Sequence, residues 1–284
     1  MSLERIAVLG AGIMGRGIAY AAAVAGYDTT LYDASPAALD QGAVEIRALM
    51  DKGVAAGKLG AEVRDRARLG THSELVDAAD GADLVIEAIP ENMKLKCDTF
   101  TELDARTAPH TILASNTSSL SITEMAGATK RPDRVVGMHF FNPVHRMRLL
   151  EVVRGLETSE ATIEAARVVG MRMGKECVVV REAPGFVTTR INALIGNEAF
   201  RMLEEGVATA PDIDKALKLG LNHPMGPFEL VDLVGLDTRL SILTFLHETL
   251  GERYRPNNLM VQYVKAGRLG RKAGKGVYEY GEGA

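Results

Sequence analysis

The 284-residue sequence has only two cysteines, Cys97 and Cys177, and no tryptophan. The cysteines are far apart in sequence, one in a helix-like and the other in a strand-like context. This arrangement predicts neither a disulfide framework nor a zinc site. We therefore expect no metal ion, and we expect the protein to reside in a reducing cytoplasm.

Long hydrophobic runs and a large charge of one sign are absent as well. No apolar run approaches the roughly 18 residues that a membrane helix needs, and a strand followed at once by a glycine loop at the start predicts no signal peptide. The net charge of -4 argues against nucleic acid or an anionic membrane surface as a partner. With 46% hydrophobic and 25% charged residues, the composition is that of a soluble globular protein with one or two domains.

The first motif in the chain is a glycine-rich turn in "RIAVLGAGIMGRGIAYAAAVAG". An apolar strand leads into Gly10, Gly12 and Gly15, and an alanine-rich helix follows. Such glycines allow a tight turn, the approach of the backbone to a pyrophosphate, and close packing of helix on strand. With Ile13 and Met14 between them, they are predicted to bind a dinucleotide at the helix N-terminus. A purely structural glycine turn is the alternative.

The next strand, "DTTLYD", ends in an acid, Asp33, which stands 18 positions after Gly15. This is close to the spacing expected for a carboxylate that binds the ribose 2′-hydroxyl of a dinucleotide. A carboxylate repels a 2′-phosphate, and Ala34 and Ser35 offer no arginine to bind one. The sequence therefore favours NAD over NADP.

Strand-like and helix-like segments alternate as far as residue 183, and only helical periodicity follows from residue 187 to about residue 264. Alternation with short loops predicts a Rossmann-type, doubly wound, mainly parallel sheet. We expect an NAD-binding domain over residues 1–183 and a smaller all-helical domain over residues 184–284, contributing to the substrate cleft and to dimerisation. The largely apolar segment 229–246 would be an isolated core or, as we expect, a shared dimer interface.

Two ionisable residues interrupt apolar segments in "GMHFFNPVHRMRLLEVV". His139 follows a predicted buried strand, 134–138, and Glu151 lies inside a second, 149–153. A buried charge is costly unless it is paired. A histidine can take the hydroxyl proton of an alcohol, and a carboxylate on its other ring nitrogen would orient it. The two residues form such a pair if the chain doubles back between them; a structural His–Glu pair is the alternative.

The order of several segments carries a family resemblance: "VLGAGIMGRGIA", "VIEAIPENMKLK", "SNTSSLSI", "GMHFFNPV", "LLEVV", "APGFV", "GPFELVDLVGLD" and "GKGVYEY". Over essentially its whole length the sequence resembles the 3-hydroxyacyl-CoA dehydrogenases, in particular the short bacterial 3-hydroxybutyryl-CoA dehydrogenases. The resemblance implies NAD-dependent oxidation of a short-chain 3-hydroxyacyl-CoA to the 3-ketoacyl-CoA, and the reverse. It also implies that His139 is the catalytic base and Glu151 its orienting carboxylate.

The same resemblance implies further site residues. Ser118 matches a serine that bonds the substrate, and Asn142 an asparagine beside nicotinamide and substrate. Glu91, Lys96 and Lys275 match cofactor positions. Other readings stay open: Ser118 as a helix cap, Glu91 as a first-turn acid, Lys96 on a solvated helix face, and Asn142 as a turn residue.

Some positions depart from the family pattern. Thr189 stands where an asparagine is usual, and it can still bond substrate through its one hydroxyl. His145 stands where many relatives carry proline; it is expected to be solvated instead of acting as a second base. Lys52 and Lys58 are the nearest candidates for CoA phosphates, although a solvated helix face is the favoured interpretation of each.

The sequence leaves two alternatives to this function open. One is a related dehydrogenase acting on a free hydroxy acid or sugar acid, with an activity like that of L-gulonate 3-dehydrogenase. The other is a non-catalytic NAD-binding protein. The expected partners are an acyl-CoA substrate and a second copy of the chain.

Overall fold

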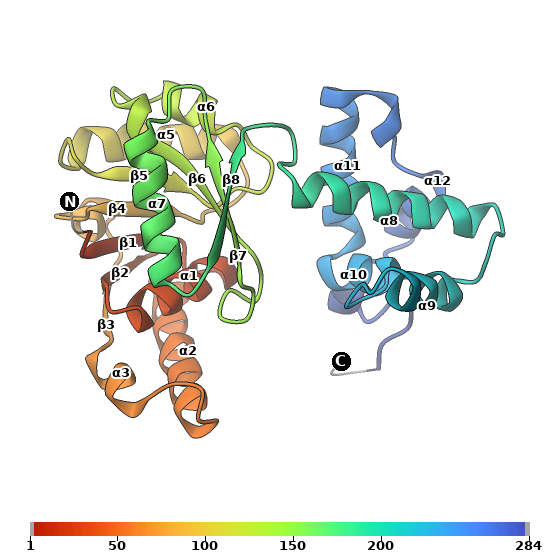
Figure 1. The fold of residues 1–284 in the computed structure, drawn as a ribbon, viewed down its shortest axis with the longest axis horizontal. Helices are drawn as coiled ribbons and strands as arrows, with labels where there is room; N and C mark the ends of the chain where they lie inside the picture. Colours follow the sequence, from red (N-terminus) through yellow and green to blue (C-terminus); the bar gives the residue numbers. More distant parts are fainter. Residues whose placement is uncertain (1–2, 282–284) are drawn as a thin grey trace. The chain divides into compact units, whose positions relative to one another are not determined.

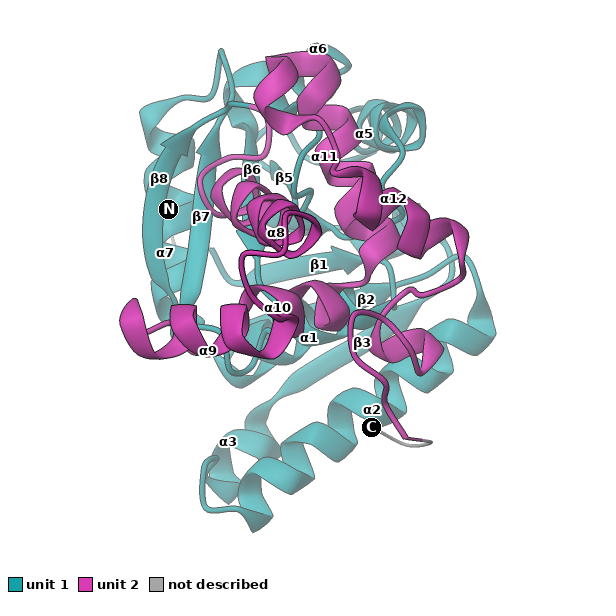
Figure 2. Cartoon of the chain, turned by 90° about the vertical axis from the view of Figure 1, so that its right-hand side faces the viewer, with its two compact units in different colours: residues 1–183 teal, residues 184–284 magenta. Residues whose placement is uncertain are grey.

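The computed structural model describes residues 3–281, and the chain divides into two compact units, residues 1–183 and 184–284 (Figures 1 and 2). The first unit contains one eight-stranded sheet with the order β3-β2-β1-β4-β5-β6-β7-β8. All neighbouring strands are parallel except β6 and β7, which are antiparallel. The expected Rossmann-type, mainly parallel sheet is thus confirmed. The strands are β1 (Arg5–Leu9), β2 (Asp28–Tyr32), β3 (Arg68–His72), β4 (Leu84–Glu87), β5 (Ile112–Ser115), β6 (Val135–Phe140), β7 (Leu149–Arg154) and β8 (Glu176–Arg181).

Helices cover both faces of this sheet (Figure 1). One face forms a core with α1, α2 and α7, to which the strands contribute alternate residues such as Val136 and Met138. Gly137, between them, points the other way and meets Ile122 of α6, so α6 lies on the opposite face. The helices of the unit are α1 (Ile13–Val24), α2 (Pro36–Ala55), α3 (Ala61–Arg66), α4 (Leu75–Ala79), α5 (Met93–Arg106), α6 (Ile122–Gly127) and α7 (Glu160–Arg172), with a 3₁₀ turn η1 at Pro132–Arg134.

The helix boundaries follow from capping residues. Ser35 accepts a hydrogen bond from Ala38 N at the start of α2, where Pro36 occupies the first helical position. Ser159 caps α7 in the same way and Glu160 follows in its first turn. The sequence analysis did not predict α7, although this cap signal was present. The helix α4 was also missed, and α6 was implied only by the cap interpretation of Ser118, because five and six residues are too few to show a helical period.

The second unit contains helices and no strand within residues 184–281, as expected, apart from isolated bridges of Lys275 with Gly270 and Glu279. Its core contains Phe200, Phe228, Val231 and Leu243, all at most 1% exposed. Gly235, at φ +102°, separates two helices within the apolar segment 229–246, so part of that segment builds the unit's own core. The helices are α8 (Thr188–Glu204), α9 (Ala210–Gly220), α10 (Pro227–Val234), α11 (Leu236–Leu250) and α12 (Asn258–Lys265), with 3₁₀ turns η2 (Glu252–Tyr254) and η3 (Arg271–Ala273). In residues 3–281 no helix is long and apolar enough to cross a membrane.

Candidate active site

The histidine and the glutamate predicted to pair do meet in the structure. His139 lies inside β6, not after it as expected, and its register partner on β7 is Glu151. Directly opposite residues of antiparallel strands point to the same face. His139 Nδ1 is 2.8 Å from Glu151 Oε2, and the two residues are 6% and 1% exposed. The contact that the sequence analysis required is therefore confirmed.

The position of the pair determines what it can do. His139 is the last residue but one of β6, so it lies near the carboxyl edge of the parallel strands, where folds of this type bind ligands. The ring of Phe141 packs against the imidazole at a centroid distance of 4.4 Å. When Nδ1 carries its proton toward Glu151, Nε2 is the nitrogen that can accept a proton from an alcohol. The arrangement is that of a general base held by a carboxylate.

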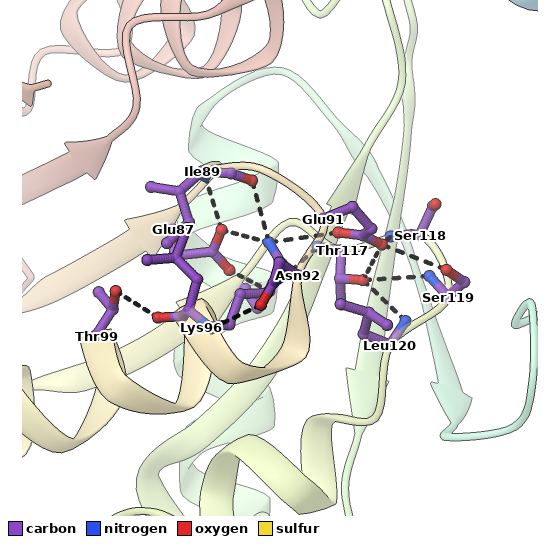
Figure 3. Close-up of polar contacts among 12 residues, drawn as sticks. Glu87, Ile89, Glu91, Asn92, Lys96, Thr99, Thr117, Ser118, Ser119 and Leu120 are labelled. Atoms are coloured by element: carbon purple, nitrogen blue, oxygen red, sulfur yellow. Dashed lines mark hydrogen bonds and ion pairs between the residues drawn. The ribbon is translucent and has the colours of Figure 1, made fainter. Parts of the chain in front are cut away.

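Ser118 lies in the loop that follows the neighbouring strand, β5. Glu91 Oε1 holds this loop by accepting hydrogen bonds from Thr117 Oγ1 at 2.5 Å, Ser118 N at 3.3 Å and Ser119 Oγ at 3.3 Å (Figure 3). The helix-cap reading of Ser118 is wrong, because Ser121 caps α6.

A second bond joins this loop to the strand of His139. Asn116 Oδ1 accepts a hydrogen bond of 2.9 Å from Phe140 N, the residue after His139. Asn116 was not identified from the sequence. Because of this bond, a shift of the Ser118 loop is transmitted to the strand that carries the candidate base.

The structure excludes the alternative interpretations of Glu91 and Lys96. Glu91 precedes the N-cap of α5, Asn92, so it is a loop residue and not a first-turn acid. Lys96 is only 1% exposed and cannot lie on a solvated face. Its Nζ is 2.5 Å from Glu87 Oε1 and 3.4 Å from Glu91 Oε2 (Figure 3). Glu87 was missed, although an acid inside an apolar strand is the same signal that identified Glu151.

The glycine turn has the geometry that a bound dinucleotide needs. Gly10 has φ +101°, and a Cβ there would lie 2.6 Å from Ala88 O. A Cβ on Gly15 would lie 1.7 Å from Gly10 O, so helix and turn touch at this point. A Cβ on Gly12 would meet nothing within 4 Å, and no side chain caps α1, which begins at Ile13. Open space in front of an uncapped helix N-terminus fits a pyrophosphate.

Asp33, at the carboxyl end of β2, is oriented by the backbone. Its Oδ2 accepts from Ala11 N at 2.8 Å, and its Oδ1 accepts from Ser35 N at 2.9 Å. Each carboxylate oxygen can accept a second hydrogen bond, so these bonds leave capacity for ribose hydroxyls. The acid is thus joined directly to the glycine turn.

Gly15 and Gly12 are expected to respond differently to replacement by alanine. Gly15→Ala places a methyl group on Gly10 O and is expected to destabilise the unit by several kcal/mol or prevent folding. Gly12→Ala meets open space in the protein and is expected to leave the melting temperature of the cofactor-free protein within about 2 °C. Its methyl group would occupy the pyrophosphate position, so Kd for NADH is expected to rise at least about tenfold. Unchanged NADH affinity in Gly12→Ala, measured by fluorescence titration, would place the cofactor elsewhere.

A cleft of about 410 Å³ lies between α1, α2 and the loop after β6. Its lining includes Ile13, Arg16, Lys52, Asn142 and His145. Partial burial and the charges of Arg146, Lys175 and Lys58 hold the pKa of His145 below its usual value. In the lining, Arg16 pairs with Glu45 at 3.0 Å and Lys52 adds a further positive charge, so the cleft is cationic overall.

Asn142, Lys52 and Lys58 are associated with this cleft. Asn142 is exposed and contributes to the lining, as does Lys52 from α2. Lys58 follows the end of α2, and its charge acts on His145. The structure thus groups the three residues around one cationic surface of the first unit.

Thr189 and Lys275 belong to the second unit. Thr189 lies in the first turn of α8 and is half-buried. Lys275 is half-exposed, and its Nζ forms an ion pair of 2.6 Å with Glu279. Within residues 3–281, no three His, Cys, Asp or Glu side chains gather into a cluster able to hold a metal ion.

Comparison with known proteins agrees with this geometry. A model of the 3-hydroxyacyl-CoA dehydrogenase NAD binding domain matches residues 5–183, and a model of the C-terminal domain of 3-hydroxyacyl-CoA dehydrogenase matches residues 185–280. A Bacillus subtilis protein named "Probable 3-hydroxybutyryl-CoA dehydrogenase" is 48% identical over 284 residues, covering 99% of each chain. A 3-hydroxybutyryl-CoA dehydrogenase of Bradyrhizobium diazoefficiens is 45% identical over 98% of this chain and 96% of its own. The crystal structure of (S)-3-hydroxybutyryl-CoA dehydrogenase from Ralstonia eutropha has a TM-score of 0.95 and 42% identity, covering 99% of this chain and all of the other.

Proposed function

Because the chain belongs to the 3-hydroxyacyl-CoA dehydrogenase family, we propose that it oxidises short 3-hydroxyacyl-CoA thioesters, 3-hydroxybutyryl-CoA first among them, to 3-ketoacyl-CoA, and catalyses the reverse reaction. The observation that carries the proposal is the 2.8 Å contact between His139 Nδ1 and Glu151 at the carboxyl edge of the sheet. A family member that had lost catalysis would not need a buried base and carboxylate at this position.

The chemistry divides between cofactor and protein. NAD⁺, when bound, supplies the acceptor for the hydride that leaves C3 of the substrate. His139 Nε2 takes the proton of the 3-hydroxyl. The departing hydride carries two electrons from C3, so the C–O group becomes a carbonyl. Glu151 stabilises the imidazolium that forms. In the reverse reaction His139 returns the proton.

Substrate orientation is assigned to Ser118 and Asn142. Ser118 lies on the loop bonded to the strand of His139 through Asn116, so its hydroxyl can hydrogen-bond the reacting oxygen next to the base. Asn142 lies on the chain segment just after β6 and lines the cationic cleft. Holding the alcohol in one orientation lowers the barrier because little freedom is left to lose in the transition state.

The cofactor is assigned to the glycine turn and the residues around it. Gly10, Gly12, Gly15, Ile13 and Met14 would hold the pyrophosphate at the start of α1. Asp33 would bind the adenosine ribose, and this carboxylate would exclude the 2′-phosphate of NADP. Glu91 would face the nicotinamide side, and Lys275 is assigned to the cofactor as well.

The CoA portion of the substrate carries phosphates, and the cleft next to Asn142 carries positive charge. Lys52 lines the cleft and Lys58 lies near its His145. We assign both lysines to the CoA phosphates. Thr189 is assigned to the substrate as well, with its hydroxyl in place of the usual amide.

The helical unit is also proposed to form a homodimer. Val187 and Ile191 are 53% and 54% exposed and lie four residues apart, so they share one side of α8. Large apolar groups exposed together commonly mark an interface. We expect sedimentation of the wild-type protein to give twice the chain mass and of Val187→Glu/Ile191→Glu to give the monomer. A monomeric wild-type protein would contradict the proposal. The expected cytoplasmic location stays a prediction.

A panel of substrates and cofactors tests the proposed reaction. We expect NADH formation from (S)-3-hydroxybutyryl-CoA to exceed that from free 3-hydroxybutyrate or L-gulonate by at least about 10³-fold in kcat/KM, because the free acids lack the CoA contacts. Replacing NAD with NADP is also expected to lower kcat/KM by a large factor, because the carboxylate of Asp33 repels the 2′-phosphate of NADP. A preference for a free acid would favour the hydroxy-acid or sugar-acid alternative. NADH binding without turnover of any hydroxyacyl substrate would favour a non-catalytic NAD-binding protein.

A further inference from the structure

Glu87 is a buried acid that the proposed reaction does not yet use. It ends β4 and is 0% exposed. Its Oε1 accepts from Ile89 N at 2.7 Å and from Lys96 Nζ at 2.5 Å. Its Oε2 accepts from Ser115 Oγ at 2.6 Å. Both oxygens are thus bonded, and Figure 3 shows Glu87 and Lys96 on one side of Glu91 and the loop that carries Ser118 on the other.

These bonds form a continuous connection between two loops of the candidate site. Lys96 Nζ bonds Glu87, Ile89 O at 3.3 Å and Glu91 Oε2 at 3.4 Å. Glu91 in turn holds the backbone of Ser118. On the other side, Ser115 Oγ accepts from Thr117 N at 3.2 Å. The loop carrying Ser118 is therefore fixed through Glu91 and through Ser115, and Glu87 is bonded directly or through Lys96 to both.

The charges explain why Glu87 and Lys96 must act together. With Lys96 between them, one buried ammonium group holds two carboxylates, that of the buried Glu87 and that of Glu91, whose side chain is 41% exposed. Without the negative charge of Glu87, the ammonium has only Glu91 as an anionic partner and would draw that side chain inward. Without Lys96, Glu87 and Glu91 would repel each other. Either loss moves Glu91 and therefore the Ser118 loop.

We propose that Glu87 is a positioning residue for catalysis, which acts through Lys96 and Ser115 to hold Glu91 and the Ser118 loop in their working positions. The proposal rests on the roles assigned above to Glu91 and Ser118. It also changes the role of Lys96: this lysine serves the cofactor side through Glu91, because its own ammonium group is buried and paired.

The test compares single and double variants in the intact protein. Glu87→Gln and Lys96→Met are each expected to lower the melting temperature of the cofactor-free protein, because each removes one member of the buried Glu87–Lys96 ion pair and leaves the charge of the other. The double variant Glu87→Gln/Lys96→Met removes both charges, so its melting temperature is expected to return toward that of the wild type. Its kcat is nevertheless expected to stay about 10²-fold low, and its Kd for NADH to stay raised. A merely structural ion pair predicts recovery of kcat and NADH affinity together with stability, and that result would overturn the proposal.

A conservative variant covers the case in which the double variant does not fold. Glu87→Asp keeps the charge, but its shorter side chain cannot reach Ile89 N, Lys96 and Ser115 together. Its kcat is expected to fall about tenfold, and its melting temperature is expected to fall less than that of Glu87→Gln, because the negative charge beside Lys96 is kept. Wild-type kcat in Glu87→Asp would count against the proposal.

A partly buried ion pair near the amino ends of the strands supplies the control. Asp104 and Arg131 are joined at 2.7 Å, and Arg131 also bonds Ala108, which precedes β5. Asp104→Asn/Arg131→Met is expected to change the melting temperature while kcat and NADH affinity stay at wild-type values. A loss of kcat in this control as large as that in the Glu87 variants would remove the distinction on which the proposal depends. If the wild-type protein itself fails to oxidise 3-hydroxybutyryl-CoA, the proposed function fails instead, and NADH affinity still reports on Glu87.

Discussion

Replacing His139 with alanine is expected to lower kcat for oxidation of 3-hydroxybutyryl-CoA by about 10²–10⁴-fold, the usual contribution of a general base. The methyl group cannot take the hydroxyl proton as the hydride leaves, so water must do so from a less favourable position. The binding of NADH is expected to be unchanged, because the glycine turn and Asp33 are separate from β6. Steady-state kinetics and a fluorescence titration measure the two effects independently.

The control for this variant is another histidine of the same unit. His110 is half-exposed and lies just before β5, at the amino edge of the sheet, where it pairs with Asp83 at 3.5 Å. His110→Ala is expected to keep wild-type kcat. Near-normal turnover in His139→Ala would show that the base has been assigned wrongly, whatever the result for His110.

Replacing Glu151 with glutamine is expected to lower kcat by a similar factor, on the order of 10²–10⁴-fold. Glutamine has nearly the same volume, so the buried site between β6 and β7 stays filled. Its amide can donate a hydrogen bond to Nδ1, which would leave the imidazole proton on Nε2, the atom that must accept. It also removes the negative charge that stabilises the imidazolium. KM is expected to change little, because Glu151 contacts the histidine and not the substrate.

Glu176 offers a matched glutamate on the neighbouring strand. It lies in β8, is paired with the exposed Arg148, and its side chain is 69% exposed. Glu176→Gln is expected to leave kcat unchanged, since an exposed ion pair contributes little. If Glu151→Gln retained full kcat while His139→Ala lost it, the orienting role of Glu151 would be refuted and that of His139 would stand.

Local patterns predicted the parts of the site that depend on neighbours in sequence. The strand, glycine turn and helix around Gly10 are contiguous, and Asp33 follows after one short strand. The pairing of His139 with Glu151 needed one tertiary assumption, an antiparallel return of the chain, and the twelve-residue separation left few other possibilities. Burial on both strands then required the two polar residues to meet.

Contacts between elements that are far apart in the sequence could not be predicted from such local patterns. Lys96 was assigned to the cofactor by the family resemblance, with a solvated helix face as the alternative, and only the packing of α5 places it against Glu87. Asn116 bonds the backbone of a strand 24 residues away, for which the sequence carries no signal. Glu87 is different. An acid in the apolar strand "LVIE" needs a partner for the same reason as Glu151, so the pairing of Glu87 could have been predicted from the sequence.

A crystal structure of the protein with NADH and acetoacetyl-CoA would test the central claim most directly. We predict that the 3-oxygen of the acyl group lies within about 2.6–3.2 Å of His139 Nε2, with C3 facing the nicotinamide ring and Glu151 still on Nδ1. A complex in which that oxygen is bound by other groups and lies beyond hydrogen-bonding distance of His139 would contradict the account.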